Sequence, residues 1–467
     1  MSTVGSTERP LRVAIVGSGP AGFYAAGQLL QNKELTVSVD VFDRLATPWG
    51  LVRFGVAPDH PKIKSVTRVF EKAAQKPGFR FHGNVEIGRD LSHQQLADAY
   101  DAVLYAVGTP ADRHLNIPGE ELAGSGSATE FVAWYNGHPD YADASFDLSA
   151  KRAVVVGNGN VALDVARMLM LSGEELAVTD TTDHAIAALR DSEVEEVVVL
   201  GRRGPVQAAF TTPELLELGE LTLADVVVHQ DEIELDPSSA KALEDADKTT
   251  TSNVETLREY AGRTPSGKPR RIVLRFLASP VEILGDEQGH VRGVVIERNE
   301  LVEDGGRLAA KPTGQRETLE AGLVFRAVGY VGTPLPGVPF DADKLRILNQ
   351  DGRVLDPETR QPLAGVYAAG WVKRGPSGVI GTNKKCATDT VELLLEDLGA
   401  GRLPSPSENP DALLEQLRER GVPVIDYAGW EAIDAHEKAL GEPQNRPRVK
   451  LVDRDEQLRV AGYQPVG

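Results

Sequence analysis

The sequence predicts an α/β fold with two nucleotide-binding units, the second inserted into the first. Two glycine-rich fingerprints, at residues 17–22 and 157–162, lie about 140 residues apart. Each follows an apolar strand-like run and opens a helix-like stretch, the arrangement that seats a pyrophosphate on a helix N-terminus. We therefore expect two Rossmann-like domains, with the first fold interrupted by the second and resuming after it. Two nucleotides in one chain suggest electron transfer between cofactors.

The first unit reads as a strand, a helix and two further strands. The alternate valines at 37, 39 and 41 suit a buried parallel strand. The expected elements are a strand at 11–16, a helix at 21–30 and strands at 36–42 and 101–107. Strands at 323–328 and 365–369 would complete the later part of the chain.

The second unit repeats this pattern and adds an acidic stretch. The expected elements are a strand and helix within 153–169, a strand at 197–200, and an antiparallel set at 271–277, 281–284 and 291–297. Residues 171–196 hold eight carboxylates against Arg190 alone, so we expect a solvated helical insertion there.

The C-terminal region shows little that points to chemistry. Residues 403–410 are a linker rich in proline and serine, and the stretches 412–420 and 430–440 have helical patterns. We find no pattern typical of a binding or catalytic site in these two helices.

Composition excludes several classes of protein. A chain of 467 residues is expected to hold two or three domains. Its single cysteine, Cys386, excludes an intrachain disulfide and an iron–sulfur cluster held by this chain alone. The net charge of −19 argues against nucleic acid as a partner. No apolar run is long enough to span a membrane, and residues 1–10 lack a signal or transit pattern, so we expect a cytoplasmic protein without membrane insertion.

The first fingerprint predicts a site for FAD or NAD. Gly17 permits the tight turn, Gly19 lets the backbone approach a pyrophosphate, and Gly22 lets the helix pack on the strand. Asp43 ends the next strand, where a carboxylate can accept hydrogen bonds from a ribose diol. Because that carboxylate repels a 2′-phosphate, the site disfavours NADP. The alternative is a glycine-rich turn that binds no ligand.

The second fingerprint predicts a site for NADP(H). It ends in Ala162, and the next strand ends in Arg202 and Arg203 in place of an acid. Two guanidinium groups can bind a 2′-phosphate by charge-assisted hydrogen bonds. The alternative is a solvated or ion-paired couple of arginines. We therefore expect an FAD-binding domain of residues 1–112 and 329–467, interrupted by an NADP-binding domain of residues 113–328.

The chain resembles the adrenodoxin reductase type of ferredoxin–NADP⁺ reductase in its bacterial form. Three runs are the most specific: Pro48-Trp-Gly-Leu-Val52, Ala57-Pro-Asp-His-Pro61 and Gly370-Trp-Val-Lys-Arg-Gly-Pro376. The matching segments also include both fingerprints, Asn116-Ile-Pro-Gly119 and Gly201-Arg-Arg-Gly204, and span nearly the whole chain. One departure is Asp43, where the family more often has glutamate.

The resemblance implies which residues contact each cofactor. For FAD they are, besides the fingerprint glycines, Ala21, Asp43, Leu51, Val85, Trp371, Gly378, Val379 and Ile380. For NADP(H) they are Arg113, Asn158, Gly159, Asn160, Val161, Arg202, Arg203, Glu214 and Gly378. NADPH would deliver a hydride to the flavin N5, and the flavin would pass single electrons to a ferredoxin.

Three further residues are candidates for proton handling or catalysis. In the family the histidine at His60 lies near the flavin and is thought to handle a proton, although it could equally be a structural histidine bonded to the backbone. Glu214 follows Thr212-Pro213 and has the alternative of a helix N-terminal acid. Asp164 lies on the helix after the second fingerprint, where a structural role is an equal alternative.

The stretch 258–275 is a basic exception in an acidic chain. Ferredoxins are usually acidic, so we expect one to dock near Arg258, Arg263, Arg270 and Arg271. The alternative is an ordinary charged loop. A lesser basic group, Lys373, Arg374, Lys384 and Lys385, lies in the expected flavin region.

Two rival functions stay open at this point. One is an electron-input subunit of a glutamate synthase-like complex, although such subunits usually carry cluster cysteines. The other is a non-catalytic NADP-binding sensor, against which the flavin-side residues argue.

Overall fold

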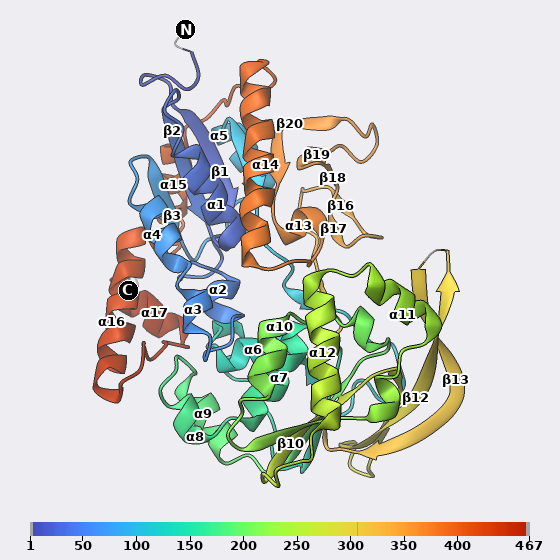
Figure 1. The fold of residues 1–467 in the computed structure, drawn as a ribbon. Coiled ribbons are helices and arrows are strands. Elements are labelled where there is room, and N and C mark those ends of the chain that lie inside the picture. The colour runs from blue at the N-terminus through green and yellow to red at the C-terminus, as the bar shows by residue number, and fades with distance from the viewer. Residues whose placement is uncertain (1–2, 306, 464–467) are drawn as a thin grey trace. The chain divides into compact units, whose positions relative to one another are not determined.

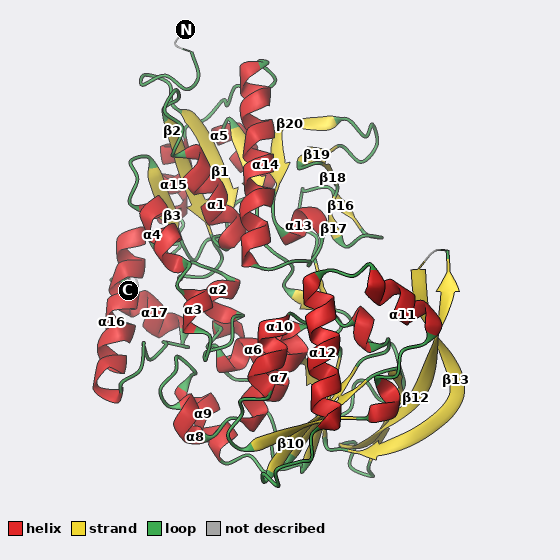
Figure 2. Cartoon of the chain, viewed as in Figure 1, coloured by secondary structure: helices red, strands yellow, loops and turns green. Residues whose placement is uncertain are grey.

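The computed structural model describes residues 3–305 and 307–463. The chain divides into two compact units, each with its own sheet and covering helices (Figures 1 and 2); the sheet of unit 1 is mixed and that of unit 2 is parallel. Unit 1 comprises Met1–Ala111 and Tyr330–Gly467, and unit 2 comprises Asp112–Gly329.

Unit 1 is built on a seven-stranded sheet in the order β18-β19-β20-β4-β1-β2-β3. Its strands are β1 (Leu11–Val16), β2 (Val37–Phe42), β3 (Phe79–His82), β4 (Ala102–Tyr105), β18 (Asn349–Gln350), β19 (Arg353–Leu355) and β20 (Pro362–Ala368). β1 pairs in parallel with β2 on one side and β4 on the other. The strand order therefore reverses at β1, which is the place where open α/β sheets bind nucleotides.

Helices cover this sheet, and α1 (Pro20–Leu29) packs along α14 (Ile380–Gly399). The other helices of unit 1 are α2 (Leu51–Phe54), α3 (Pro61–Lys64), α4 (Thr67–Ala74), α5 (His93–Ala99), α13 (Trp371–Arg374), α15 (Pro410–Glu419), α16 (Tyr427–Gly441) and α17 (Arg454–Val460). Short strands β16 (Phe340–Asp341) and β17 (Arg346–Ile347) pair with each other, and β15 is Tyr330–Val331.

Unit 2 is built on a six-stranded sheet in the order β6-β14-β7-β8-β10-β9. Its strands are β6 (Ser125–Ser127), β7 (Arg152–Val156), β8 (Glu196–Leu200), β9 (Ala224–Val228), β10 (Arg270–Arg275) and β14 (Leu323–Arg326), and their pairings are all parallel. The helices are α6 (Ala128–Tyr135), α7 (Asn160–Met170), α8 (Gly173–Leu176), α9 (Asp183–Arg190), α10 (Thr212–Leu218), α11 (Pro237–Glu244) and α12 (Lys248–Gly262). β5 is Ala111–Asp112.

A separate antiparallel sheet is formed by β11 (Ala278–Gly285), β12 (Val291–Asp304) and β13 (Arg307–Glu320). The prediction that residues 271–277 join this sheet is wrong. They belong to β10, which pairs in parallel with β8 and β9. The third strand is β13, whose polar sequence gave no strand signal. The antiparallel set was therefore right in kind but wrong in one member.

The acidic stretch 171–196 is not the solvated insertion that we expected. It does contain two helices, α8 and α9, but Leu176, Ala185 and Leu189 are fully buried in the core of unit 2. Glu174 and Asp183 are exposed on these helices, whose inner faces pack on the domain, whereas Asp180 and Glu196 lie outside the helices and are buried.

Within the described part of the chain, no helix is long and apolar enough to cross a membrane. The cytoplasmic location stays a prediction.

Candidate functional site

The first fingerprint forms a turn that only glycine can occupy at two places. Gly17 has a φ of +105°, and a Cβ there would lie 2.5 Å from the Ala106 carbonyl oxygen. A Cβ on Gly22 would lie 2.0 Å from the Gly17 carbonyl oxygen. Gly19 is the N-cap of α1, whose first turn carries no acidic side chain. The free N–H groups of this helix end therefore meet no competing negative charge.

Asp43 follows β2 and is tied to the same turn. Its Oδ2 accepts hydrogen bonds from Ser18 N (2.8 Å) and Ser18 Oγ (2.5 Å), and its Oδ1 accepts one from Leu45 N (3.0 Å). A carboxylate offers about four acceptor positions, so one stays for a ribose hydroxyl. Val85 N donates to the Asp43 carbonyl oxygen (2.8 Å), which places Val85 beside the acid.

A tight turn at residues 49–50 lies directly on the fingerprint. Trp49 has a φ of +84° and donates its N–H to the Ser18 carbonyl oxygen (2.9 Å). A Cβ on Gly50 would lie 2.9 Å from Gly19 Cα, so the two backbones are nearly in contact. Leu51, the first residue of α2, is thereby held at the edge of the fingerprint loop.

The segment after β20 closes the other side of the loop. A Cβ on Gly370 would lie 2.7 Å from Ala21 Cβ, so this segment packs on the first turn of α1. Trp371 follows, with its ring centroid 5.3 Å from that of Tyr330. Gly378 and Val379 are exposed just before α14 begins at Ile380.

The chemistry of these segments fits a bound flavin nucleotide. Thr47 Oγ1, Thr109 Oγ1 and Trp371 Nε1 are buried, yet none has a hydrogen-bond partner among the described residues. Buried polar atoms are nearly always paired, so such a group around one loop indicates partners supplied by a ligand. His60 precedes α3 and donates its backbone N–H to the Ala57 carbonyl oxygen (3.0 Å).

The second fingerprint repeats the turn with an open face. Gly157 has a φ of +133°, and a Cβ there would lie 2.3 Å from the Ala327 carbonyl oxygen. A Cβ on Gly159 would meet nothing within 4 Å, so the backbone is accessible to a pyrophosphate. Asn160 Oδ1 accepts from Thr211 N (2.8 Å), and Asn158 Nδ2 is buried with no hydrogen-bond partner in the part of the chain that the structure describes. Val161 packs partly buried against the core of unit 2.

Arg202 and Arg203 lie just after β8 and keep free guanidinium groups. Arg202 is exposed and Arg203 half-buried, and neither side chain has a partner among the described residues. Burial, and then the neighbouring charge of Arg202, lower the pKa of Arg203. Two close cations with no carboxylate between them are suited to a 2′-phosphate.

Sequence reasoning missed the residue that shapes the arginine loop. Asn299, 3% exposed, donates from Nδ2 to the Arg202 carbonyl oxygen (2.9 Å) and to Ser279 Oγ (2.8 Å). It lies at an irregularity of β12, where the register with β13 shifts between Glu297 and Asn299. An asparagine inside a strand pattern is the only signal that could have pointed to it.

The positions of the other predicted residues of unit 2 do not by themselves indicate contact with a nucleotide. Asp164 Oδ1 pairs with buried Arg167 (2.9 Å), a contact that supports the structural alternative. Glu214 lies in the first turn of α10, in keeping with a helix N-terminal acid. Arg113 is exposed, and its N–H donates to the Gly329 carbonyl oxygen (3.0 Å).

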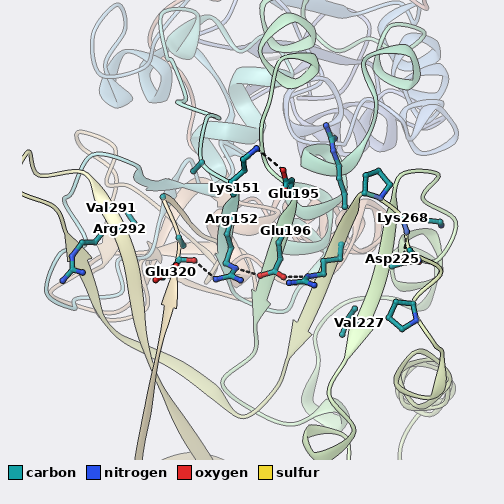
Figure 3. A pocket seen from close by; sticks show the side chains of 18 residues that line it. Lys151, Arg152, Glu195, Glu196, Asp225, Val227, Lys268, Val291, Arg292 and Glu320 are labelled. Atoms are coloured by element: carbon teal, nitrogen blue, oxygen red, sulfur yellow. Dashed lines mark hydrogen bonds and ion pairs between the residues drawn. The ribbon is translucent and has the colours of Figure 1, made fainter.

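The basic stretch 258–275 is less positive than its sequence suggests. Along a pocket of about 720 Å³, Arg152 pairs with Glu196 and Lys151 pairs with Glu195 (2.9 Å), as Figure 3 shows. Arg271 pairs with the same Glu196. Arg263 pairs with Glu259 (2.5 Å). Arg258 alone is exposed without a partner among the described residues.

The position of this stretch also differs from that of the nucleotide loop. Arg270 and Arg271 begin β10, whereas the fingerprint follows the end of β7, and both strands run parallel to β8. The arginines therefore lie at the N-terminal ends of the strands and the nucleotide loop at the C-terminal ends, roughly 15 Å apart at ~3.3 Å per residue.

Comparisons with known proteins identify the family. Residues 11–199 match the pyridine nucleotide-disulphide oxidoreductase family. The NADPH-ferredoxin reductase FprA of Mycobacterium leprae is 51% identical over 455 residues, which covers 96% of this chain and 98% of the relative. A solved structure of Mycobacterium tuberculosis FprA in complex with NADPH is 50% identical, with a TM-score of 0.92 over 97% of this chain and 100% of that chain.

A plant relative supports the same assignment. The mitochondrial NADPH:adrenodoxin oxidoreductase of Arabidopsis thaliana is 41% identical over 467 residues, covering 98% of this chain and 96% of the relative. The resemblance drawn from the sequence is thereby confirmed: the chain belongs to the family of the NADPH-ferredoxin reductases, the adrenodoxin reductase type of ferredoxin–NADP⁺ reductase.

Proposed function

We propose that the protein passes electrons from NADPH, through FAD held by unit 1, to a ferredoxin-type iron–sulfur protein. One observation carries the cofactor assignment. The first fingerprint has a carboxylate, Asp43, beside it, whereas the second has the cations Arg202 and Arg203, which have no partner among the described residues. Opposite charges at equivalent places favour a ribose diol in unit 1 and a 2′-phosphate in unit 2.

Each cofactor is assigned to the residues that surround its fingerprint. FAD would be held by the 17–22 loop, Asp43, Val85, the 49–51 turn and the 370–371 and 378–380 segments. NADP(H) would be held by the 158–161 loop, Arg202, Arg203, Arg113 and Glu214. When bound, FAD accepts a hydride from NADPH and releases electrons one at a time, which suits an iron–sulfur acceptor.

The chain's own residues bind, orient and handle protons. The fingerprint helices hold the pyrophosphates, and the arginine pair selects NADP over NAD. We assign to His60 the handling of the proton that remains once the two electrons of the hydride have left the flavin, because an imidazole can accept and donate a proton. Glu214 and Asp164 are secondary candidates for this role.

For the partner, we propose a docking face centred on Arg258 and Arg263. Both are exposed, and Arg258 is unpaired among the described residues. Arg270 and Arg271 would contribute less, because Arg271 shares Glu196 with Arg152 and Arg270 faces the carbonyls of Leu169 and Leu171 (3.4 Å each). An acidic ferredoxin would be steered by the remaining positive charge.

A visible spectrum of the purified protein tests the function. We expect flavin absorbance that NADPH bleaches and NADH bleaches far more slowly, and heat-released cofactor that co-elutes with FAD. A colourless protein would favour the NADP-binding sensor. Reduction that requires a second synthase subunit, with no activity toward ferredoxin, would favour the glutamate synthase-like alternative.

Charge reversal tests the docking face. With Arg258→Glu and Arg263→Glu together, ferredoxin-dependent cytochrome c reduction should slow and lose its dependence on salt, since exposed charges are screened within ~10 Å at 0.1 M. NADPH-to-ferricyanide activity should not change. If only reversal of Lys384 and Lys385 slows ferredoxin reduction, docking lies on unit 1.

A further inference from the structure

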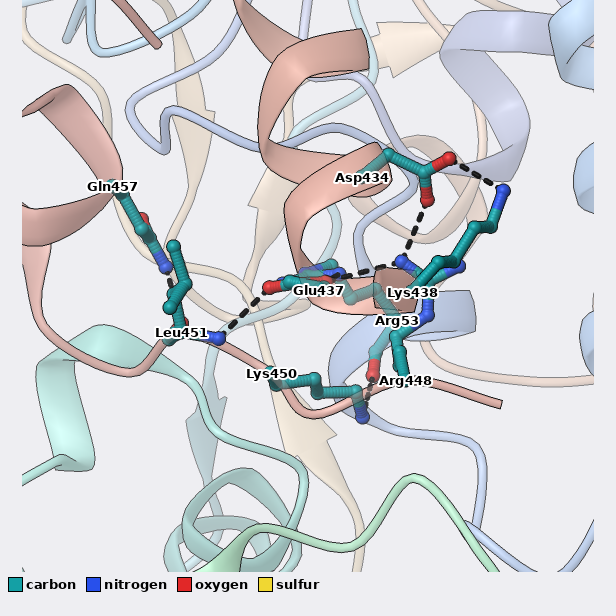
Figure 4. A network of polar contacts seen from close by, with 8 residues as sticks. All are labelled: Arg53, Asp434, Glu437, Lys438, Arg448, Lys450, Leu451 and Gln457. Atoms are coloured by element: carbon teal, nitrogen blue, oxygen red, sulfur yellow. Dashed lines mark hydrogen bonds and ion pairs between the residues drawn. The ribbon is translucent and has the colours of Figure 1, made fainter. Parts of the chain in front are cut away.

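The turn that carries Trp49 and Leu51 leads into Arg53, which pairs with Glu437 from the C-terminal part of the chain (Figure 4). Glu437, on α16, is fully buried and lies 384 residues from Arg53, which is on α2. Its Oε2 accepts from Arg53 Nη1 (2.9 Å) and its Oε1 from Arg53 Nη2 (2.5 Å). This two-pronged geometry fixes the orientation of the arginine as well as its distance.

The same carboxylate organises the segment that follows α16. Glu437 also accepts from Arg448 Nη1 (3.1 Å) and from Leu451 N (2.9 Å). Lys450 Nζ, from this segment, donates to the Arg53 carbonyl oxygen (3.2 Å). Burial alone raises the pKa of Glu437, but Arg53 and Arg448 outweigh burial, so its pKa lies below the ordinary value. The carboxylate is thus held ionised and saturated with donors.

Aromatic packing adds to this fastening. The Trp49 ring meets Trp430, also on α16, edge-to-face with centroids 4.8 Å apart. The Arg53 guanidinium lies 5.3 Å from the centroid of the Trp430 ring. The side chains of Trp49 and Arg53 are therefore both anchored on α16.

The turn needs such support because its backbone is strained. A tryptophan with a φ of +84° occupies a region that non-glycine residues rarely adopt, and such residues persist where their surroundings over-determine them. Trp49 N bonds to Ser18 O, and Gly50 nearly touches Gly19. Any relaxation of the turn would therefore move groups that border the pyrophosphate position.

We propose that Glu437 and Arg53 are positioning residues for FAD, which hold the 49–51 turn against the fingerprint so that losing their pairing releases FAD before the domain unfolds. The inference rests on the assignment of FAD to unit 1. It gives a role to the helix at 430–440, in which the sequence showed no chemistry.

The test is the rate of FAD release from the holoenzyme, followed by flavin fluorescence after dilution. Glu437→Gln keeps the volume and removes the charge, and we expect release at least about tenfold faster, with a changed visible circular dichroism of the bound flavin.

The matched control is Asp397→Asn, which removes another buried carboxylate of unit 1. Asp397 bonds to Arg353 (2.9 Å), Tyr367 (2.7 Å) and Arg402 (2.7 Å). It lies 17 residues beyond Ile380 on α14, about 25 Å at 1.5 Å per residue. We expect Asp397→Asn to lower the unfolding midpoint in urea about as much as Glu437→Gln does, yet to leave the rate of FAD release within about twofold of wild type.

A second variant covers the case in which Glu437→Gln does not fold. Lys450→Met leaves the Arg53–Glu437 pair and removes the donor to the Arg53 carbonyl, so we expect release several-fold faster than wild type. Equal release from these variants and from Asp397→Asn, at equal loss of stability, would overturn the inference. A wild-type protein without FAD would overturn the site assignment itself.

Discussion

The two fingerprints of this protein fold alike, but the charged groups beside them are treated in opposite ways. In unit 1 the acid after β2, Asp43, already accepts three hydrogen bonds from the protein. In unit 2 the two arginines after β8 have no partner among the described residues. The carboxylate of Asp43 is mostly occupied by hydrogen bonds within the turn, whereas we expect the two guanidinium groups to bind a ligand.

From this difference we infer where each unit would obtain its selectivity. A carboxylate that is already bonded excludes a phosphate and has room for one hydroxyl, so it selects mainly by repulsion. Burial, and then the charge of Arg202, lower the pKa of Arg203. The two guanidiniums have no partner among the described residues, so they would gain most from binding a dianion. We therefore expect unit 2 to select by attraction.

The residues that hold the two loops in place also differ in charge. The strained turn of unit 1 is fastened by a buried ion pair, Arg53–Glu437, whereas the arginine loop of unit 2 is fastened by a neutral amide, Asn299. A carboxylate at Asn299 would offer the arginines an internal partner. The neutral amide shapes the loop without competing for its charge.

The largest expected effect comes from removing the attraction in unit 2. In Arg202→Ala/Arg203→Ala, KM for NADPH should rise at least about 100-fold and KM for NADH should change little, because each lost charge-assisted bond contributes about 1.5–3 kcal/mol. Arg190→Ala, which removes an exposed arginine paired with Asp191, is the control and should change neither. Equal losses with both nucleotides would show that the pair does not recognise the 2′-phosphate.

The next effect tests the acid of unit 1. Asp43→Asn should weaken FAD binding about 10- to 100-fold, since an amide has one acceptor oxygen where three donors now converge, at about 1–3 kcal/mol for unsatisfied partners. Flavin retained after gel filtration measures it. Binding of 2′,5′-ADP should be unchanged, and a parallel loss there would contradict the separation of the two sites.

A third test uses pH on another buried acid of unit 1. Burial raises the pKa of Asp40, but hydrogen bonds from His82 and Arg80 outweigh it and lower the pKa to about 2. Because the folded pKa lies below the ordinary 3.8, this stabilisation is complete above about pH 4 and is lost as pH falls toward 2. It is worth about 2 kcal/mol at neutral pH.

Urea unfolding of wild type and Asp40→Asn between pH 7 and pH 3 measures this contribution. The difference in free energy of unfolding between wild type and Asp40→Asn should be largest at neutral pH and should become smaller as the pH falls. A gap that stays constant would mean that Asp40 acts through packing alone.

The smallest expected effect concerns the support of the arginine loop. Asn299→Ala removes one neutral hydrogen bond to Arg202 O, about 1 kcal/mol, and should raise KM for NADPH about fivefold without changing KM for NADH. Thr313→Ala, which removes a similar bond to the Arg298 carbonyl oxygen on the same ribbon, is the control. If both variants behave alike, the loop is shaped by the strand and not by the amide.

The sequence by itself determined the α/β class, the two fingerprints and the sign of the charge beside each. These follow from local rules: Gly17 and Gly157 are needed where φ is positive, and Asp43 and Arg202–Arg203 follow strands at a fixed offset. It also predicted most elements around them, since strands and helices of a βαβ unit have a clear periodicity.

Only the tertiary structure decided which charges are free. In sequence, Arg271 and Arg202 look alike, but the parallel register of β7, β8 and β10 places Glu196 beside Arg271, whereas no described carboxylate pairs with Arg202. In the same way, Glu437 gave no signal 384 residues from Arg53. Pairing between residues so far apart in sequence depends on how strands and helices are placed in space, which the periodicity along the chain does not predict.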